Sequence, residues 1–205
     1  MICPNMTNAE FYVTVMRVRD LAVAYMDDRL AELARWNAAD QDRVKIWFAE
    51  ATPRIRSRLQ GGLQRMRDIT LGLTETNFER FSKENLAAVG CVPAAKDGEE
   101  PATASVCKPD KSFTIFIGTK FCYLSEVRRT NGVPLDVDSK LTVLVHELSH
   151  FPAAMDTNDL FSNIRAGRWM ATRQNKFLIE NADNIAAYVA DIPNWHGSGD
   201  HKWTP

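Results

Sequence analysis

The sequence lacks a long hydrophobic run. A wholly apolar stretch such as Leu21–Met26 is far shorter than the roughly 18 residues that a membrane-spanning helix needs. We therefore expect no membrane-spanning segment and no membrane partner. The first residues, MICPNMTNAEF, also lack a basic region followed by an apolar one, so an export signal would have been removed or would be of another kind.

Charge of one sign is not in excess either. Lysine and arginine number 25 against 26 aspartates and glutamates, which gives a formal net charge of −1. The chain therefore has no global basic field that would gather nucleic acid or anionic lipid. We predict no nucleic-acid partner, and the net charge identifies no other partner.

Cysteine is scarce, and no two cysteines form the C-x-x-C pair of zinc ribbons and thioredoxin-like redox sites. The four cysteines are Cys3, Cys91, Cys107 and Cys122. Two disulfides and four reduced core thiols are both compatible with this number and spacing. Cys91 and Cys107 flank an irregular segment that a disulfide between them would close.

The chain does have enough length and apolar content for one well-packed domain. It has 205 residues, of which 45% are hydrophobic and 25% are charged, close to the averages for soluble globular proteins. A chain of this length buries about 70% of its unfolded surface on folding, so it needs no metal or disulfide merely to fold. A bound metal would therefore serve function.

Amphipathic helices are predicted along the first half of the chain. Apolar residues recur at three- and four-residue steps from Asn8 to Trp36, which is typical of a long helix with one buried face. Asp40 is a candidate N-cap for a second helix. Thr52 followed by Pro53 is a well-formed start for a third helix.

The third helix is crowded with arginines, a pattern that some nucleic-acid-binding proteins share. The aromatic residues that would interleave in a stacking platform are missing, so the pattern favours a solvated helix face. Gly61 and Gly62 lie in the middle of this helix and weaken it. The arginines are Arg54, Arg56, Arg58, Arg65 and Arg67.

Short strands and further helices are predicted in the second half. The alternation of Phe113–Ile117 and the apolar Phe121–Leu124 indicate a hairpin or two edge strands. Asp136 or Asp138 can cap the next helix, and another helix ends near residue 192. The sequence thus predicts a helix-dominated α+β fold with a small β-sheet.

We expect one domain over residues 1–205. Its parts would be a helical half at about 8–90, a loop with short strands at about 91–126, and helices at about 138–192 that carry the catalytic residues. No internal repeat and no change of composition divides the chain.

The segment from His146 to His150 reads HELSH, which is the pattern H-E-x-x-H. Four residues of α-helix turn about 400°, so both imidazoles project from one face and can share one ion. Glu147 lies about 100° around the helix from His146, near enough to reach a water on that ion as a general base. Burying these side chains beside Leu144 and Leu148 without partners would cost several kcal/mol, which metal ligation offsets. The motif therefore predicts a catalytic zinc site.

A catalytic zinc usually has three protein ligands and a water, so a third ligand is needed. Asp156 lies where the metzincin pattern H-E-x-x-H-x-x-G-x-x-H would place its last histidine, although Ala153 replaces the glycine of that pattern. Glu180 resembles the helical glutamate ligand of thermolysin-type enzymes. Asp159 is the third candidate, and the spacing of these carboxylates leaves the choice open.

Three segments, in this order, resemble the deuterolysin and peptidyl-Lys metalloendopeptidase family, the aspzincins. They are HELSH at 146–150, TNDL at 157–160 and ENADNIAAYV at 180–189. In that family the helix motif is followed by a Gly-Thr-x-Asp segment whose aspartate is the third zinc ligand, and later by an Asn-Ala-Asp run that opens a helix. The resemblance covers residues 141–190 and implies a zincin-like metalloprotease fold.

The resemblance also implies a role for each matching residue. Glu147 would be the general base, while Asp183 and Thr157 would support the ligands from behind, by holding a histidine N–H or bracing the ligand loop. The implied zinc ligands are His146, His150 and Asp159.

The chain departs from the family pattern near the third ligand. The family glycine before the threonine is Asp156, and the family tyrosine that steadies the oxyanion is Ser162, followed by Asn163 in place of glycine. Loss of a positioned oxyanion donor typically costs about 2.7–4 kcal/mol of transition-state stabilisation, so another group substitutes or the activity is modest. Tyr188 and Tyr123 are candidate donors, although a core tyrosine with a satisfied hydroxyl is the simpler interpretation of each.

The sequence therefore predicts a zinc-dependent endopeptidase that hydrolyses peptide bonds through a Glu-activated water, with the substrate paired to an edge strand near Phe113–Ile117. One alternative is a zincin of another subclass, with Asp156 or Glu180 as the third ligand. Another is a zinc-binding interaction or toxin module with weak or lost protease activity. We expect a monomer that is secreted or delivered outside the producing cell, and we expect His196 and His201 to be solvated.

Overall fold

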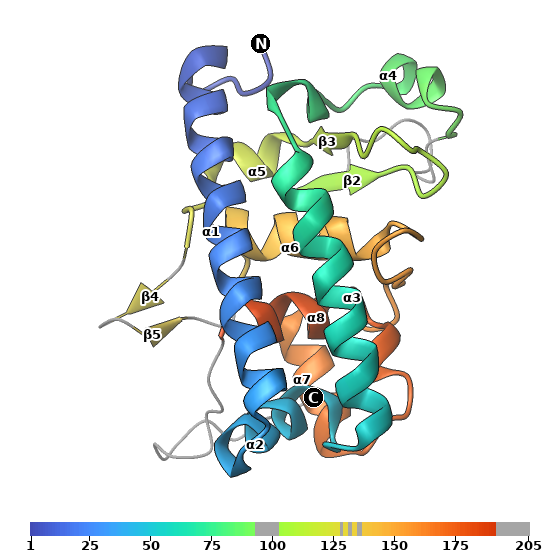
Figure 1. Ribbon diagram of the computed structural model, residues 1–205. Helices are drawn as coiled ribbons and strands as arrows, with labels where there is room; N and C mark the ends of the chain where they lie inside the picture. The colour runs from blue at the N-terminus through green and yellow to red at the C-terminus, as the bar shows by residue number, and fades with distance from the viewer. Residues whose placement is uncertain (93–102, 128, 131–132, 135–136, 192–205) are drawn as a thin grey trace.

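The computed structural model describes residues 1–92, 103–127, 129–130, 133–134 and 137–191. Three helices dominate the first part of the chain, and α1 packs against the other two, lying side by side with α3 (Figure 1). The buried face of α1 follows the three- and four-residue steps of its apolar residues, such as Phe11, Val15 and Val18. These helices are α1 (Asn8–Arg35), α2 (Ala38–Phe48) and α3 (Pro53–Gly72).

The second part of the chain supplies the helices that surround the HELSH segment. They are α6 (Lys140–His150), α7 (Ile164–Thr172), the short 3-10 helix η3 (Leu178–Glu180) and α8 (Ala182–Val189). In Figure 1, α6 crosses behind α1 and α3, and it packs against both α1 and α8. Because neighbours cover it on several sides, nearly every residue of α6 is buried, including polar ones such as Lys140, Thr142 and Ser149.

A small mixed sheet lies beside these helices. Its strands are β1 (Phe78–Arg80), β2 (Ala104–Val106) and β3 (Ile115–Ile117), in the order β1-β3-β2. β3 pairs in parallel with β1 and antiparallel with β2. The strand at 115–117 is therefore central, and the expectation that Phe113–Ile117 offers an edge to substrate is wrong. β2 lies at an edge of this sheet and contacts α6.

The remaining elements are short. They are η1 (Glu75–Asn77), α4 (Lys83–Ala88), α5 (Thr119–Tyr123) and the two-stranded ribbon of β4 (Arg129–Thr130) and β5 (Val133–Pro134). The prediction of a strand at Phe121–Leu124 is wrong, since α5 occupies this segment and buries Phe121 and Cys122. The apolar side chains of this segment face the core from a short helix, and the disulfide Cys3–Cys122 joins that helix to the N-terminal segment.

Capping differs in detail from the sequence prediction. Ser139 caps α6, because its Oγ accepts a hydrogen bond from the N–H of Thr142 at 3.1 Å while Oγ1 of Thr142 accepts one from the N–H of Ser139 at 2.9 Å. This reciprocal pair satisfies two otherwise free donors. Asp138 is therefore not the cap, and Asp136 lies outside the described residues. In α2 the cap is Asn37, and Asp40 completes its capping box.

The helix α7 is amphipathic, since its buried residues Ile164, Gly167 and Ala171 recur at three- and four-residue steps. It packs closely on α8, because a Cβ added at Gly167 would lie 2.5 Å from Oδ1 of Asn184. Gly167 thus permits a close approach of the two helices, and its effect on helix propensity alone would argue against a helix here.

Two disulfides close the structure. Cys3 is bonded to Cys122, which fastens the N-terminal segment to α5, and Cys91 is bonded to Cys107. The alternative of four reduced thiols is therefore wrong. In the part of the chain that the structure describes, no helix is long and apolar enough to cross a bilayer. The predicted helix-dominated α+β fold is confirmed.

Candidate metal centre

The last turns of α6 bring the HELSH side chains together. Glu147 and His150 are buried, and His146 is partly exposed. The imidazole rings of His146 and His150 have their centroids 4.8 Å apart. This is the arrangement that a four-residue helical spacing predicts, with both rings on one face of the helix.

Asp159 meets both imidazoles from the loop that follows α6. Its Oδ1 lies 3.0 Å from Nε2 of His146 and 3.4 Å from Nε2 of His150. One ligand atom from each of His146, His150 and Asp159, here called the metal group, lies within 4.8 Å of the other two. Two imidazole nitrogens and one carboxylate oxygen match the donor set of a catalytic zinc with an open position. No other such group occurs among the residues that the structure describes.

The second nitrogen of each ring already has a partner. Nδ1 of His146 lies 3.1 Å from Oδ1 of Asp183 on α8. Nδ1 of His150 lies 3.0 Å from the carbonyl oxygen of Thr157. Both acceptors hold a hydrogen on Nδ1, so that each ring in its neutral form would bind a metal through Nε2.

Acidic groups around the two histidines set the local pKa values. Burial would lower the pKa of His146, but hydrogen bonds to Asp159 and Asp183 outweigh it and raise this pKa to about 10. Contacts with His146 and His150 hold the pKa of Asp159 well below its usual range. Burial raises the pKa of Glu147. Three carboxyl groups beside two imidazoles give the centre an excess of potential negative charge, which a divalent cation would compensate.

The loop that carries Asp159 is held by Glu180 and Asn181, which directly precede α8. Asn158 and Asn181 form a short parallel bridge, in which Asn158 N–H donates to the Glu180 carbonyl at 2.8 Å. The side-chain oxygen of Asn181 accepts hydrogen bonds from the N–H groups of Leu160 and Phe161, each at 3.0 Å. Backbone donors on both sides of Asp159 are thus satisfied by one segment, which fixes the loop.

Asn181 and Asn184 hold the ligand loop and α8 together, a role that the sequence interpretation did not assign. Both are fully buried, and Nδ2 of Asn181 donates to Oδ1 of Asn184 at 2.7 Å. Nδ2 of Asn184 in turn donates to the carbonyl of Trp47 at 2.7 Å. Asn181 opens the Asn-Ala-Asp run at 181–183 and Asn184 directly follows it, so this run was the available sequence signal. Buried side-chain amides need hydrogen-bond partners within the fold.

The start of the same loop is held by α6. Thr157 is fully buried, and its N–H donates to the carbonyl of Ser149 at 3.1 Å. The hydroxyls of Ser149 and Thr157 lie 2.6 Å apart, and the Ser149 hydroxyl also bonds to the carbonyl of His146 at 2.6 Å. The structure therefore places Thr157 directly behind the metal group.

The two rival third ligands lie outside the metal group. Asp156 turns toward Lys108, whose Nζ lies 2.9 Å from its carboxylate, and its side chain is largely exposed. Its φ of 55° lies in the left-handed region that favours glycine and that aspartate tolerates, which gives a physical reason for the family glycine. Glu180 is exposed on η3 and contributes its backbone carbonyl to the loop bridge.

Asn163 carries a strained backbone where the family has glycine. Its φ is 107° and its ψ is 159°, a combination that is essentially restricted to glycine. The residue is nevertheless held in place, because its N–H donates to Oδ2 of Asp183 at 2.8 Å and its Oδ1 accepts from the N–H of Ala166 at 2.9 Å. Ser162 before it is exposed.

Tyr188 is not placed to serve as an oxyanion donor. It lies five residues after Asp183, about 140° further around α8, and its ring makes an edge contact with Phe48 of α2 at 5.5 Å. Burial raises the pKa of its hydroxyl, and the charges that act on it, such as Arg29, come from α1 and α2. Tyr188 is therefore a core residue, as the simpler interpretation has it, but its buried hydroxyl has no hydrogen-bond partner among the described residues.

The other sequence candidates are easily placed. Tyr123 ends α5 and is 65% exposed. His196 and His201 lie outside the described residues.

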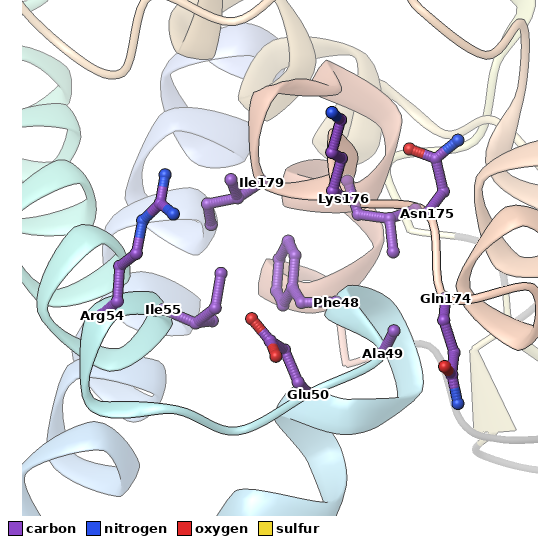
Figure 2. A pocket seen from close by; sticks show the side chains of 10 residues that line it. Phe48, Ala49, Glu50, Arg54, Ile55, Gln174, Asn175, Lys176 and Ile179 are labelled. Atoms are coloured by element: carbon purple, nitrogen blue, oxygen red, sulfur yellow. The ribbon is translucent and has the colours of Figure 1, made fainter.

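A cavity of about 380 Å³ opens elsewhere, between the end of α2, the start of α3 and the segment before η3. Figure 2 shows the side chains of Phe48, Ile55 and Ile179 in its interior, with Glu50 and Arg54 beside them. None of its lining residues belongs to the metal group. The cavity is therefore separate from the metal centre.

Comparison with known proteins agrees with this geometry. The family model of the aspzincins, described as lysine-specific metallo-endopeptidase, matches residues 33–190. A solved structure of a zinc peptidase from Grifola frondosa is similar with a TM-score of 0.66 and 19% sequence identity, covering 91% of this chain and 97% of that chain. At this identity the likeness shows the fold alone. No match is found among curated proteins. Because the family match spans most of the chain, including the metal group, the chain belongs to the aspzincin family and is a zinc metalloendopeptidase.

Proposed function

We propose that the zinc ion is bound by Nε2 of His146, Nε2 of His150 and the carboxylate of Asp159. One observation carries this proposal: these three atoms converge while both Nδ1 atoms are occupied by Asp183 and by the Thr157 carbonyl. Three ligand atoms are thereby directed at one point, and hydrogen bonds at Nδ1 hold both imidazole rings in this orientation.

We propose that Glu147 is the general base. When bound, zinc lowers the pKa of a water molecule and polarises the peptide carbonyl. The Glu147 carboxylate accepts a proton from the attacking water and later delivers it to the leaving amide nitrogen. Burial raises the pKa of Glu147, which strengthens the carboxylate as the acceptor of that proton. Asp183 and Thr157 hold the two imidazoles in orientation throughout.

The proposed substrate is a peptide in extended conformation that pairs with β2 by main-chain hydrogen bonds. β2 is an edge strand and contacts α6, and extended ligands commonly add to such an edge. The family description as lysine-specific makes cleavage next to lysine the first specificity to test. We further propose that residues 1–205 act as one monomeric domain outside the producing cell, where the two disulfides persist.

One observation favours a second candidate function, a zinc-binding module with weak turnover. Ser162 occupies the place of the family tyrosine, and no hydroxyl among Ser162, Tyr123 and Tyr188 has a contact with the metal group in the described structure. A missing oxyanion donor lowers kcat by about 10²–10³. A digest of casein or a peptide library, with and without a chelator, separates the two functions.

Glu147→Gln is the decisive variant. It should bind one zinc per chain as the wild type does, while hydrolysis falls by about 10²–10⁴, because only the proton transfer is lost. Glu180→Gln is the matched control, since this exposed glutamate lies outside the metal group. Undiminished hydrolysis in Glu147→Gln would reject the base assignment.

The third ligand is tested by comparing zinc content across three carboxylates. Asp159→Asn should lose zinc, whereas Asp156→Asn and Glu180→Gln should keep it, because the latter two lie outside the metal group. Retention of full zinc affinity by Asp159→Asn, or loss of it in either control, would move the assignment to another carboxylate.

A further inference from the structure

One face of α3 lies against the loop that follows α6. Arg58, Gly62 and Arg65 share this face, because they are four and three residues apart on the helix. Nη2 of Arg58 donates to the carbonyl of Met155 at 2.8 Å, and Nε of Arg65 donates to the carbonyl of Ala154 at 2.9 Å. Both arginines remain exposed, as the predicted solvated face requires, while their guanidinium groups reach these carbonyls. Arg58, Gly62 and Arg65 are called the α3 clamp below.

The two glycines in the middle of α3 make this contact possible. A Cβ at Gly62 would lie 2.7–2.9 Å from the Cγ, Cε and Sδ atoms of Met155, which is 1% exposed. A Cβ at Gly61 would lie 3.3 Å from Nη1 of Arg65. Glycine weakens a helix interior, so the pair has a structural reason here: it lets the loop and the guanidinium approach the helix.

The same turn is held from its other side by the end of α6. The N–H groups of Ala154 and Asp156 donate to the carbonyl of Phe151 at 2.8 and 3.2 Å, and that of Thr157 donates to Ser149. The N–H groups of the turn therefore donate to carbonyls at the end of α6, while the carbonyls of Ala154 and Met155 accept hydrogen bonds from α3. These hydrogen bonds hold the turn from both sides.

We infer that Arg58 and Arg65 are positioning residues for the zinc site. By holding the carbonyls of Ala154 and Met155, they fix the position of the backbone at the start of the ligand loop. That entry determines whether the Thr157 carbonyl reaches Nδ1 of His150 and whether Asp159, two residues later, reaches the metal group. This inference rests on the proposed zinc site.

Arg56 offers a matched control on the same helix. Its Nε donates to the carbonyl of Leu33 at 2.7 Å and its Nη2 to the carbonyl of Ala34 at 2.9 Å. The chemistry is the same, two guanidinium donors on two consecutive carbonyls, but the acceptors lie at the end of α1. Loss of Arg56 should therefore affect stability without affecting the ligand loop.

The experiment measures zinc affinity by competition with a chromophoric chelator on purified full-length chains. Arg58→Ala/Arg65→Ala should bind zinc about tenfold or more weakly, as is typical when support behind metal ligands is lost, while Arg56→Ala should stay within about twofold of wild type. Arg58→Lys/Arg65→Lys should recover most of the affinity, because each lysine can still donate to a carbonyl. Thermal unfolding of the zinc-free proteins records the loss of stability separately.

The outcomes separate the inference from the proposed function. If wild type binds no zinc, or Asp159→Asn binds it as well as wild type, the proposed zinc site fails. If wild type binds zinc and the double alanine variant has unchanged affinity, or Arg56→Ala weakens zinc as much, the positioning role fails. Should the double variant not fold, Gly62→Ala decides: it keeps both arginines, displaces Met155, and must weaken zinc binding by a similar factor if the clamp positions the loop.

Discussion

The carboxylate of Asp183 joins His146 to the loop beyond the metal group. Its Oδ1 lies 3.1 Å from Nδ1 of His146, and its Oδ2 accepts a hydrogen bond from the N–H of Asn163 at 2.8 Å. One side chain on α8 therefore orients a ring on α6 and the end of the ligand loop together. A carboxylate behind a ligand histidine fixes the tautomer of the ring and raises its basicity.

Asp183→Ala should therefore weaken zinc binding by about 10–100-fold, the usual effect of removing a partner behind a metal ligand. The measurement is chelator competition at fixed pH. Asp156→Asn is the control, because it removes a carboxylate that pairs with Lys108 and not with a histidine, and because asparagine tolerates the left-handed backbone at this position. Unchanged zinc affinity in Asp183→Ala would show that His146 is oriented by other contacts.

Asn163→Gly should stabilise the protein. The residue has a φ of 107°, and such backbone strain costs about 1–3 kcal/mol, whereas replacing an N-cap side chain by glycine costs only a few tenths of a kcal/mol. A net gain of about 1 kcal/mol corresponds to a rise in Tm of about 2–4 °C for a chain of this size.

Asn163→Ala is the matched variant, because it keeps the strained backbone and loses the hydrogen bond to Ala166. Its Tm should fall. If the glycine variant also melted below wild type, the strain at this position would be too small to matter.

Local periodicity was sufficient to predict one part of the metal centre. The pairing of His146 and His150 and the nearby position of Glu147 follow from 3.6 residues per turn, so a short motif defines them. The assignment of Asp159 needed the resemblance to the aspzincins, because a loop has no regular geometry from which the position of a side chain could be predicted. The structure adds the reason: Asn158 and Asn181 bridge two segments that are far apart in sequence.

The parts that sequence reasoning missed depend on contacts across the fold. Arg58 and Arg65 are exposed, as the pattern predicts, but the sequence does not show that they donate hydrogen bonds to the carbonyls of Met155 and Ala154. Likewise, the alternation at 115–117 indicates a strand but not its neighbours, and pairing on both sides makes β3 central. The spacing of apolar residues predicts which face of one helix or strand is buried, but it does not predict which other element packs against that face.

Asp110 should make the stability of the protein depend on acid pH. Burial raises the pKa of Asp110, but hydrogen bonds from Ser112 and Thr114 outweigh it, and the pKa in the folded state is lowered. Its stabilising contribution is therefore complete above the unfolded value of about 3.9 and is lost as pH falls through the folded value. The turn matters because it leads into Phe113, whose ring packs edge-on against Phe151 at 5.1 Å.

Urea unfolding of zinc-free protein at several values between about pH 5 and pH 2 tests this dependence, with zinc removed so that metal release does not contribute. The gap in free energy of unfolding between wild type and Asp110→Asn should be largest at the upper end and shrink as the pH falls. A constant gap over this range would mean that Asp110 has the same pKa in both states.

The two disulfides should contribute unequally to stability. Cys3–Cys122 closes a separation of 119 residues and Cys91–Cys107 one of 16 residues. In the chain-entropy model, loops of about 100 and about 15 residues are worth about 4.7 and about 3 kcal/mol. Cys3→Ala/Cys122→Ala should therefore lower the Tm more than Cys91→Ala/Cys107→Ala, as measured by thermal unfolding of both pairs in zinc-free buffer. Equal or reversed losses would show that contacts in the folded state, and not the constraint on the unfolded chain, dominate the effect of these bonds.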